Sequence, residues 1–256
     1  MMDSFSTTSS LFLDYINTFF GRDNDTDYYL DLKKEHTFNV LKHSQAIAKF
    51  FDKGSLEHML IPYAALFHDV GRFSQYYNYR TFHDASSEDH GLIGTQVITE
   101  NNLLKYVDKK YHDAICFAVF NHNKLSVPYL DELSNNLLLV IRDSDKLDIF
   151  RVLCNHLDPS IGKSLNSYLP DNGIINQELV SSLLNGKQIC YSKRKSYDDM
   201  KITMLNWIHD LNFPYSFRHV KEMDYINIII DSIKGKFDKE RVRDHLHTVI
   251  VTNQKE

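Results

Sequence analysis

Six histidine and aspartate residues occur in order along this chain of 256 residues. They are His36, the adjacent pair His68 and Asp69, and then His90, His122 and Asp145. Imidazole nitrogens and carboxylate oxygens together bind Mn²⁺, Fe²⁺, Zn²⁺, Co²⁺ or Ni²⁺, and carboxylates with water also admit Mg²⁺. An adjacent His-Asp pair with single ligands on either side is what a two-metal site on a helical scaffold needs. The pattern therefore points to metal-dependent chemistry.

The neighbours of these residues favour a metal cluster over isolated core histidines. His68 and Asp69 end the apolar run AALF, where an aspartate is costly to bury unless it is paired or binds a metal. Asp145 has Ile141 and Ile149 one helical turn away on either side. A single histidine on an apolar face is more often an ordinary core residue, but several buried polar groups in one chain indicate shared ligation.

The composition limits which kinds of molecule the protein is expected to bind. A formal net charge of −5 and a pI of about 6.2 disfavour a nucleic-acid polymer, whose binding needs a basic surface. The three cysteines are widely spaced, which excludes zinc-ribbon and thioredoxin motifs and suits a reducing compartment. The N-terminus lacks the regions of a signal peptide, and no apolar run reaches the roughly 18 residues of a membrane span. We therefore expect a cytoplasmic protein that has no membrane partner and acts on a small molecule.

Helices must position the six residues. The chain has only nine glycines and five prolines, and helical spacing of apolar residues is common, which predicts an all-α fold. The predicted helices cover residues 11–20, 28–51, 56–70, 88 onward, 111–122, 131–157, 176–188, 197–211, 218–233 and 238–250. Residues 72–87 and 160–175 are predicted loops. Ser86 with Asp89 resembles a capping box at the start of the helix that carries His90.

These elements predict one domain over residues 1–256. Its ligand-bearing core is expected at about 28–157, followed by a C-terminal helical extension at about 176–250. A domain boundary near 160–175 remains open.

The strings around the six residues resemble the HD superfamily of metal-dependent phosphohydrolases. They are HTFNV at His36, LFHDVGRF at His68, DHGLIG at His90, FNHN at His122 and RDSDKLD at Asp145. The resemblance spans roughly residues 30–155, and the additional His90 and His122 make the pattern similar to the binuclear members. Those members include the cyclic-dinucleotide phosphodiesterases of the HD-GYP type. The GYP tripeptide is absent, because NKLSVPYL follows His122, so specificity for cyclic di-GMP is not supported.

The resemblance implies an HD-domain helical bundle with additional C-terminal helices and two divalent metal ions. The residues that would hold the first ion are His36, His68, Asp69 and Asp145. The second ion would take His90 and His122, with Asp69 bridging both ions. Asp145 is preferred to Asp143 because the family string of Ala or Ser, Asp, a basic residue and Leu matches residues 144–147.

Two cationic residues are assigned to the substrate through the same resemblance. Arg72 follows the HD-Val-Gly string, where related proteins carry a cation that faces phosphate, and a guanidinium can clamp two phosphate oxygens. The alternative for Arg72 is a surface arginine. Lys146, next to Asp145, is expected to contact phosphate or a neighbouring carboxylate. Asp69, Arg72 and Lys146 are therefore the predicted catalytic residues.

The predicted loop 72–87 is rich in aromatic residues. These are Phe73, Tyr76, Tyr77, Tyr79 and Phe82. They would either stack a nucleobase or, as the favoured interpretation, pack the loop onto the core. His83 and Asp84 are candidate proton carriers near the mouth of the site.

The predicted function is the hydrolysis of a phosphate mono- or diester, in a nucleotide or a small phosphorylated metabolite, by a phosphodiesterase or phosphatase. Two divalent ions would lower the pKa of water towards neutrality and absorb charge on the phosphoryl oxygens. Two alternatives stay open. The same ligands serve a mixed-valence di-iron oxygenase, and a non-catalytic nucleotide-sensing module would also keep them.

Overall fold

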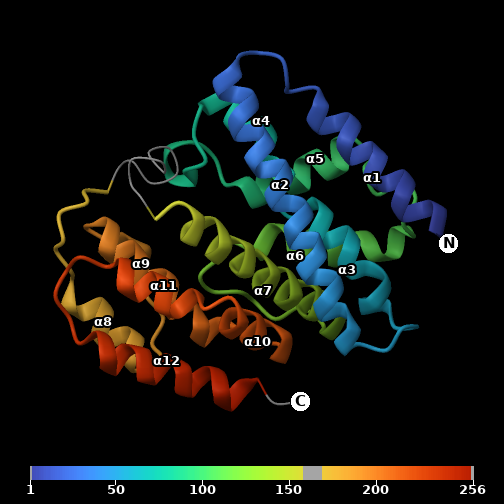
Figure 1. The fold of residues 1–256 in the computed structure, drawn as a ribbon. Coiled ribbons are helices and arrows are strands. Elements are labelled where there is room, and N and C mark those ends of the chain that lie inside the picture. The colour runs from blue at the N-terminus through green and yellow to red at the C-terminus, as the bar shows by residue number, and fades with distance from the viewer. Residues whose placement is uncertain (1, 158–168, 255–256) are drawn as a thin grey trace. The chain divides into compact units, whose positions relative to one another are not determined.

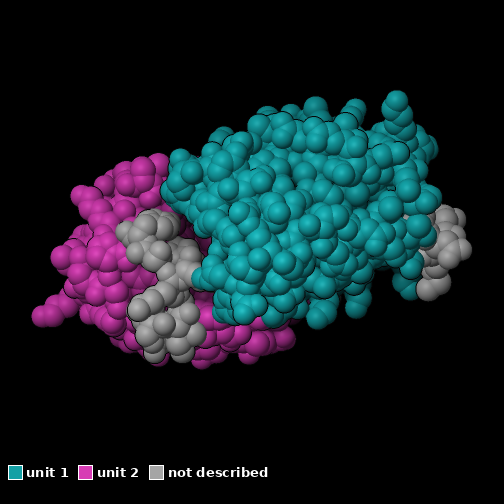
Figure 2. Space-filling view, turned by 90° about the horizontal axis from the view of Figure 1, so that it is seen from above, with its two compact units in different colours: residues 1–145 teal, residues 146–256 magenta. Residues whose placement is uncertain are grey.

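The computed structural model describes residues 2–157 and 169–254, and helices are the only regular elements in these ranges (Figure 1). The predicted all-α fold is confirmed. The chain forms two compact units, Met1–Asp145 and Lys146–Glu256 (Figure 2). Helix α7 (Glu132–Asn155) runs through the division between them. In the described part of the chain, no helix is long and apolar enough to cross a membrane.

The N-terminal unit is built from α1 to α6 and the first part of α7. The bounds are α1 Met2–Asn17, α2 Asn24–Ile47, α3 Leu56–Phe67, α4 Gly71–Tyr79, α5 His90–Glu100 and α6 His112–Asn121. Helix α2 packs against α3 and α4, α3 also contacts α1 and α6, and α5 contacts both α4 and α6. The helices that carry the predicted ligands are therefore neighbours in space.

Local sequence explains where α2 and α3 begin. Asp23 accepts a hydrogen bond from the backbone N–H of Thr26, and Ser55 accepts one from the backbone N–H of His58. Beyond Ser55, α3 is almost wholly apolar and its second half is buried. This burial holds the end of α3, where His68 and Asp69 follow, deep inside the unit.

Three predictions of where helices begin or end in this unit are wrong. Residues 72–79, predicted as part of the loop 72–87, lie in α4, and Arg80 ends this helix in the left-handed conformation at φ 57°. The N-cap of α5 is Asp89, not Ser86, and its carboxylate accepts hydrogen bonds from the next backbone N–H groups. Helix α1 begins at Met2, well before the predicted 11–20.

The close approach of the α4 backbone to that of α5 explains why the sequence analysis did not predict α4. A Cβ atom on Gly71 would lie 2.4 Å from the carbonyl oxygen of His90, and one on Gly91 would lie 2.7 Å from that of Phe120. Only glycine permits such contacts, so α4, α5 and α6 lie unusually close at these points. Packing against α5 stabilises a segment whose own sequence has no clear helical period.

The C-terminal unit has its own core. Its helices after α7 are α8 Gln177–Leu184, α9 Tyr197–Leu205, α10 Pro214–Glu222, α11 Tyr225–Ser232 and α12 Lys239–Asn253. Their buried faces form one aliphatic and aromatic cluster. The single helix predicted over 218–233 is wrong, because Asp224 adopts φ 55° and separates α10 from α11. The predicted loop 160–175 lies largely outside the described residues.

Candidate metal centre

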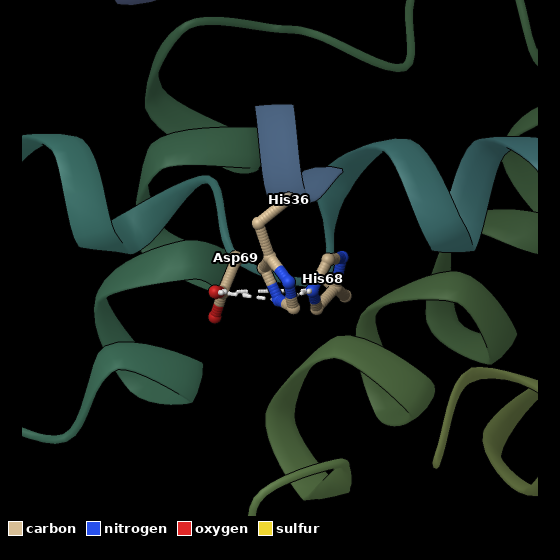
Figure 3. Close-up of side chains that lie close together, drawn as sticks. All are labelled: His36, His68 and Asp69. Carbon is tan, nitrogen blue, oxygen red and sulfur yellow. Dashed lines mark hydrogen bonds and ion pairs between the residues drawn. The ribbon is translucent and has the colours of Figure 1, made fainter. Parts of the chain in front are cut away.

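The N-terminal unit brings all six predicted ligands into one cluster. His36 lies on α2, His68 and Asp69 follow α3, and His90 begins α5. The remaining two come from the end of α6 and from α7. The four histidines and Asp69 are buried, whereas the Asp145 side chain keeps 19% of its surface exposed. Figure 3 shows His36, His68 and Asp69 pointing towards one another.

The carboxylate of Asp69 lies between two pairs of histidines. Its Oδ2 lies 3.6 Å from Nε2 of His36 and 3.8 Å from Nε2 of His68. Its Oδ1 lies 3.4 Å from Nε2 of His90 and 3.6 Å from Nε2 of His122. Each oxygen of one carboxylate therefore faces a separate histidine pair, as the bridging prediction requires.

Asp145 closes the cluster on the side of the first pair. Its Oδ1 lies 3.0 Å from Nε2 of His36 and 3.9 Å from Nε2 of His68. Asp143, the alternative ligand, is fully buried, so it is not a surface carboxylate.

The histidine tautomers leave nitrogen lone pairs inside the cluster. Nδ1 of His68 lies 2.8 Å from the carbonyl oxygen of Ala65, and Nδ1 of His122 lies 2.7 Å from that of Val119. A carbonyl only accepts, so Nδ1 carries the hydrogen in both rings, and the neutral ring keeps its lone pair at Nε2. Burial lowers the pKa of His68 to about 4 despite the nearby carboxylates, which keeps its imidazole neutral at pH 7.

His90, which with His122 faces Oδ1 of Asp69, also keeps its lone pair at Nε2, because its Nδ1 donates to Asp84 at 2.7 Å. Burial, reinforced by the charge of Arg72, lowers the pKa of His90 to about 3. Nε2 of His90 and Nε2 of His122 are nevertheless only 3.1 Å apart. Two facing lone pairs at this distance repel each other unless a cation lies between them. The donor set therefore fits divalent metal ions.

The charge on Asp69 is also favourable for ligation. Burial alone would raise its pKa, but the charge of Lys33 and the other surrounding groups, Arg72 among them, together outweigh burial, and the pKa lies well below its ordinary value. The pKa of Asp145 is likewise lowered, because the hydrogen bond and charge of His36 outweigh burial. Both groups are therefore carboxylates at neutral pH, which is the form that binds metal.

A third group of ligand atoms, from Asp84, Asp89 and His90, lies beside this cluster. The amide nitrogen of Asn123 lies 3.2 Å from an oxygen of each carboxylate and 3.3 Å from Nδ1 of His90. Lys124 forms an ion pair with Asp89. Donors from the protein therefore already satisfy this group.

Arg72 is anchored on one side only. Its Nη1 donates to Oε1 of Gln75 at 2.8 Å, to the carbonyl oxygen of Phe82 at 2.5 Å and to Asp84 at 2.9 Å. Its Nε lies 3.5 Å from Oδ1 of Asp69 and is buried with no hydrogen-bond partner among the described residues. The guanidinium is therefore not a surface group, and its Nε edge faces the cluster.

The other predicted residues have different surroundings. Lys146 lies in the C-terminal unit, where its ammonium pairs with Asp210 at 2.8 Å, so its contact with phosphate stays a prediction. The pKa of Asp84 is lowered, because the His90 hydrogen bond and Arg72 outweigh burial. Asp84 is thus ionised and lacks a proton to donate. Exposed His83 contacts the hydroxyl of Ser86 at 3.1 Å.

The five aromatic residues after Arg72 differ in burial, and Tyr79 is exposed. Phe73 is fully buried and Tyr76 is 5% exposed. Tyr76 packs on Phe82 with ring centroids 4.7 Å apart and on Tyr29 at 4.9 Å. Packing, the favoured interpretation, therefore accounts for Tyr76 and Phe82.

Lys33 is the principal site residue that the sequence analysis missed. Its ammonium lies 2.9 Å from Oδ2 of Asp69. The available signal was its spacing, because Lys33 precedes His36 by three residues on one helix and therefore lies on the same face.

The comparisons with known proteins agree with this geometry. The HD domain family matches residues 34–150, a range that contains all six clustered residues. HD domains are generally metal-dependent phosphohydrolases. No significant similarity to a curated protein or to a solved structure was found. Residues 34–150 form an HD domain, and the six clustered residues lie within it.

Proposed function

We propose that this protein hydrolyses a small phosphate ester, such as a nucleotide or a phosphorylated metabolite, with two divalent metal ions. The observation that carries the proposal is the carboxylate of Asp69, whose two oxygens face two different histidine pairs. His36, His68 and Asp145 would hold one ion, and His90 and His122 would hold the other. Asp69 would bridge the two.

When bound, the ions would lower the pKa of water and neutralise charge on the phosphoryl oxygens. The chain supplies the setting for this chemistry. His68 and His122 keep their Nε2 lone pairs directed inwards, because Nδ1 of each ring donates to a main-chain carbonyl. Little reorganisation is then needed on metal binding.

Arg72 is suited to hold a phosphate oxygen. Three acceptors fix Nη1 and hence the plane of the guanidinium. Its buried Nε–H, without a partner among the described residues, is directed to the His90 side of Asp69. An N–H left unpaired inside a protein costs free energy, which a phosphate oxygen would recover.

Lys33 supplies a second cation on the other oxygen of Asp69. An ammonium group has three N–H donors, and Asp69 accepts one of them, so the others can reach a substrate oxygen. Cations on both sides of the bridging carboxylate favour a substrate with a concentrated negative charge, such as a phosphate group. The net charge of −5 supports a small molecule over a nucleic-acid polymer.

The test is Mn²⁺-supported hydrolysis of bis-p-nitrophenyl phosphate beside p-nitrophenyl phosphate. Asp69→Asn should reduce turnover by at least about 10³-fold and release both ions, because several kcal/mol of charge stabilisation depend on the metals. The control is Asp113→Asn, which removes an exposed carboxylate from α6 and should change nothing.

The substrate that is cleaved decides the class of ester. Cleavage of the diester, lost in Asp69→Asn, identifies a phosphodiesterase, and cleavage of the monoester alone identifies a phosphatase. The proposal fails if neither ester is cleaved by protein with both ions bound. It also fails if turnover requires iron and dioxygen, which would indicate oxidative chemistry.

A further inference from the structure

Asp84 lies outside the proposed ligand set, yet its carboxylate contacts the ring of His90 at hydrogen-bond distance. We propose that Asp84 is a positioning residue that fixes His90 as a ligand of the second metal ion, an inference that rests on the proposed two-metal function. Oδ2 of Asp84 accepts from Nδ1 of His90 at 2.7 Å. A carboxylate in this position fixes the ring orientation, keeps hydrogen on Nδ1 and makes Nε2 more basic.

The carboxylate of Asp84 is itself held in place on both oxygens. Oδ1 accepts from Nη1 of Arg72 and from Nε2 of Gln75, both at 2.9 Å. Oδ2 also accepts from the amide of Asn123 at 3.2 Å. With these donors in place, Asp84 cannot rotate away from His90 without losing several charge-assisted hydrogen bonds.

Gln75 connects this arrangement to the backbone before α5. Its side chain is fully buried, and its amide nitrogen also lies 2.7 Å from the carbonyl oxygen of Glu88 and 2.9 Å from the hydroxyl of Ser87. Its Oε1 accepts from Arg72 at 2.8 Å. Gln75 therefore holds Arg72, Asp84 and the start of the His90 helix in one hydrogen-bonded unit.

His90 differs from His68 and His122 in the partner of Nδ1. His68 and His122 direct Nδ1 to neutral main-chain carbonyls, whereas His90 directs Nδ1 to a carboxylate. Removal of the charge on Asp84 should therefore weaken the ion between His90 and His122 and spare the ion at His36 and His68. The effect is selective, and a general loss of structure would not produce it.

The experiment measures Zn²⁺ binding to the full chain without any substrate. In Asp84→Asn, one of two equivalents should bind about 10–100-fold more weakly, with the other unchanged. Asp108→Asn is the matched control, because it removes the charge of an exposed carboxylate that caps a short turn and pairs with exposed Lys110. Unchanged affinity for both ions, or an equal loss at both, would overturn the proposal.

A second measurement does not depend on a variant that folds. In the zinc-loaded wild type, a two-bond ¹H–¹⁵N spectrum of ¹⁵N-histidine-labelled protein should show His90 protonated at Nδ1. Protonation at Nε2 instead would contradict the proposal. Both readouts report metal binding alone, so a protein that passes them but cleaves no phosphate ester would refute the hydrolase function and leave the role of Asp84 intact.

Discussion

The ammonium of Lys33 lies 2.9 Å from Oδ2 of Asp69, the carboxylate oxygen that faces His36 and His68. Arg72 approaches the opposite oxygen, with its Nε 3.5 Å from Oδ1. The carboxylate of Asp69 is therefore flanked by two cations, one beside each proposed metal position. This arrangement stabilises the ionised Asp69 and would offer positive charge to the proposed phosphate substrate.

Lys33→Met should impair turnover more than metal binding. The substitution keeps the length of the apolar stem and removes only the ammonium. A hydrogen bond to a charged group is worth about 1.5–3 kcal/mol, so kcat/KM for the cleaved ester should fall by about 10–100-fold. Both ions should remain bound, because the Lys33 ammonium is not a metal ligand. It contacts Oδ2 of Asp69, the oxygen that would bind the first ion.

The matched control is Lys34→Met, which removes the neighbouring ammonium on the same helix; this group lies 5.9 Å from the Phe20 ring. Lys34→Met should keep wild-type kinetics and both ions. Full kcat/KM in Lys33→Met, or loss of metal from it, would show that Lys33 does not act on the substrate.

His122→Ala should empty mainly the second metal position. His122 and His90 face the same oxygen of Asp69, whereas His36, His68 and Asp145 form the other pole of the cluster. Elemental analysis should therefore give about one ion per chain in place of two, since the first site keeps its protein ligands. His112→Ala is the control from the start of the same helix, because His112 hydrogen-bonds the Val107 carbonyl outside the cluster. Two retained ions in His122→Ala would refute the binuclear assignment.

The metal-free protein should lose stability as the pH falls below about 6.5. Burial lowers the pKa of His68 to about 4 and that of His90 to about 3, whereas in the unfolded chain both lie near 6.5. Between these values the unfolded chain binds protons that the folded protein does not. The contribution is therefore complete above about pH 6.5 and is lost as the pH falls towards 4, at about 1.4 kcal/mol per pH unit for each histidine.

Urea unfolding in the presence of a chelator measures this effect. From about pH 7 to about pH 5.5, the free energy of unfolding should drop by about 2–3 kcal/mol. His112→Gln should keep the full drop, since His112 lies outside the cluster. An unfolding free energy that stays constant over this interval would mean that the buried rings are protonated in the folded state. With metal in excess the drop should be larger, because protons and ions compete for the same nitrogens.

The order of residue types was sufficient to predict the helical class, the six clustered residues and the HD family. An apolar run that ends in His-Asp places a charge where burial is costly, and helical periodicity reports which neighbours share a face. The family, and the choice of Asp145 over Asp143, came from the resemblance of the sequence strings to HD proteins. The same reasoning failed at α4, because its helix depends on the contact of Gly71 with α5 and not on its own period.

Tertiary packing alone decided which atoms of the six residues face one another. His36 and Asp69 are 33 positions apart, and no local pattern reports which carboxylate oxygen faces which ring. The same is true of Lys33 at Asp69 and of Asp84 at His90, where the partners lie on different elements. Hydrogen-bond geometry then selected the histidine tautomers, and with them the inward-facing lone pairs that suit a metal. Distances of about 3 Å between distant residues are fixed by the whole helical core, which is why the clustered residues were predictable and their arrangement was not.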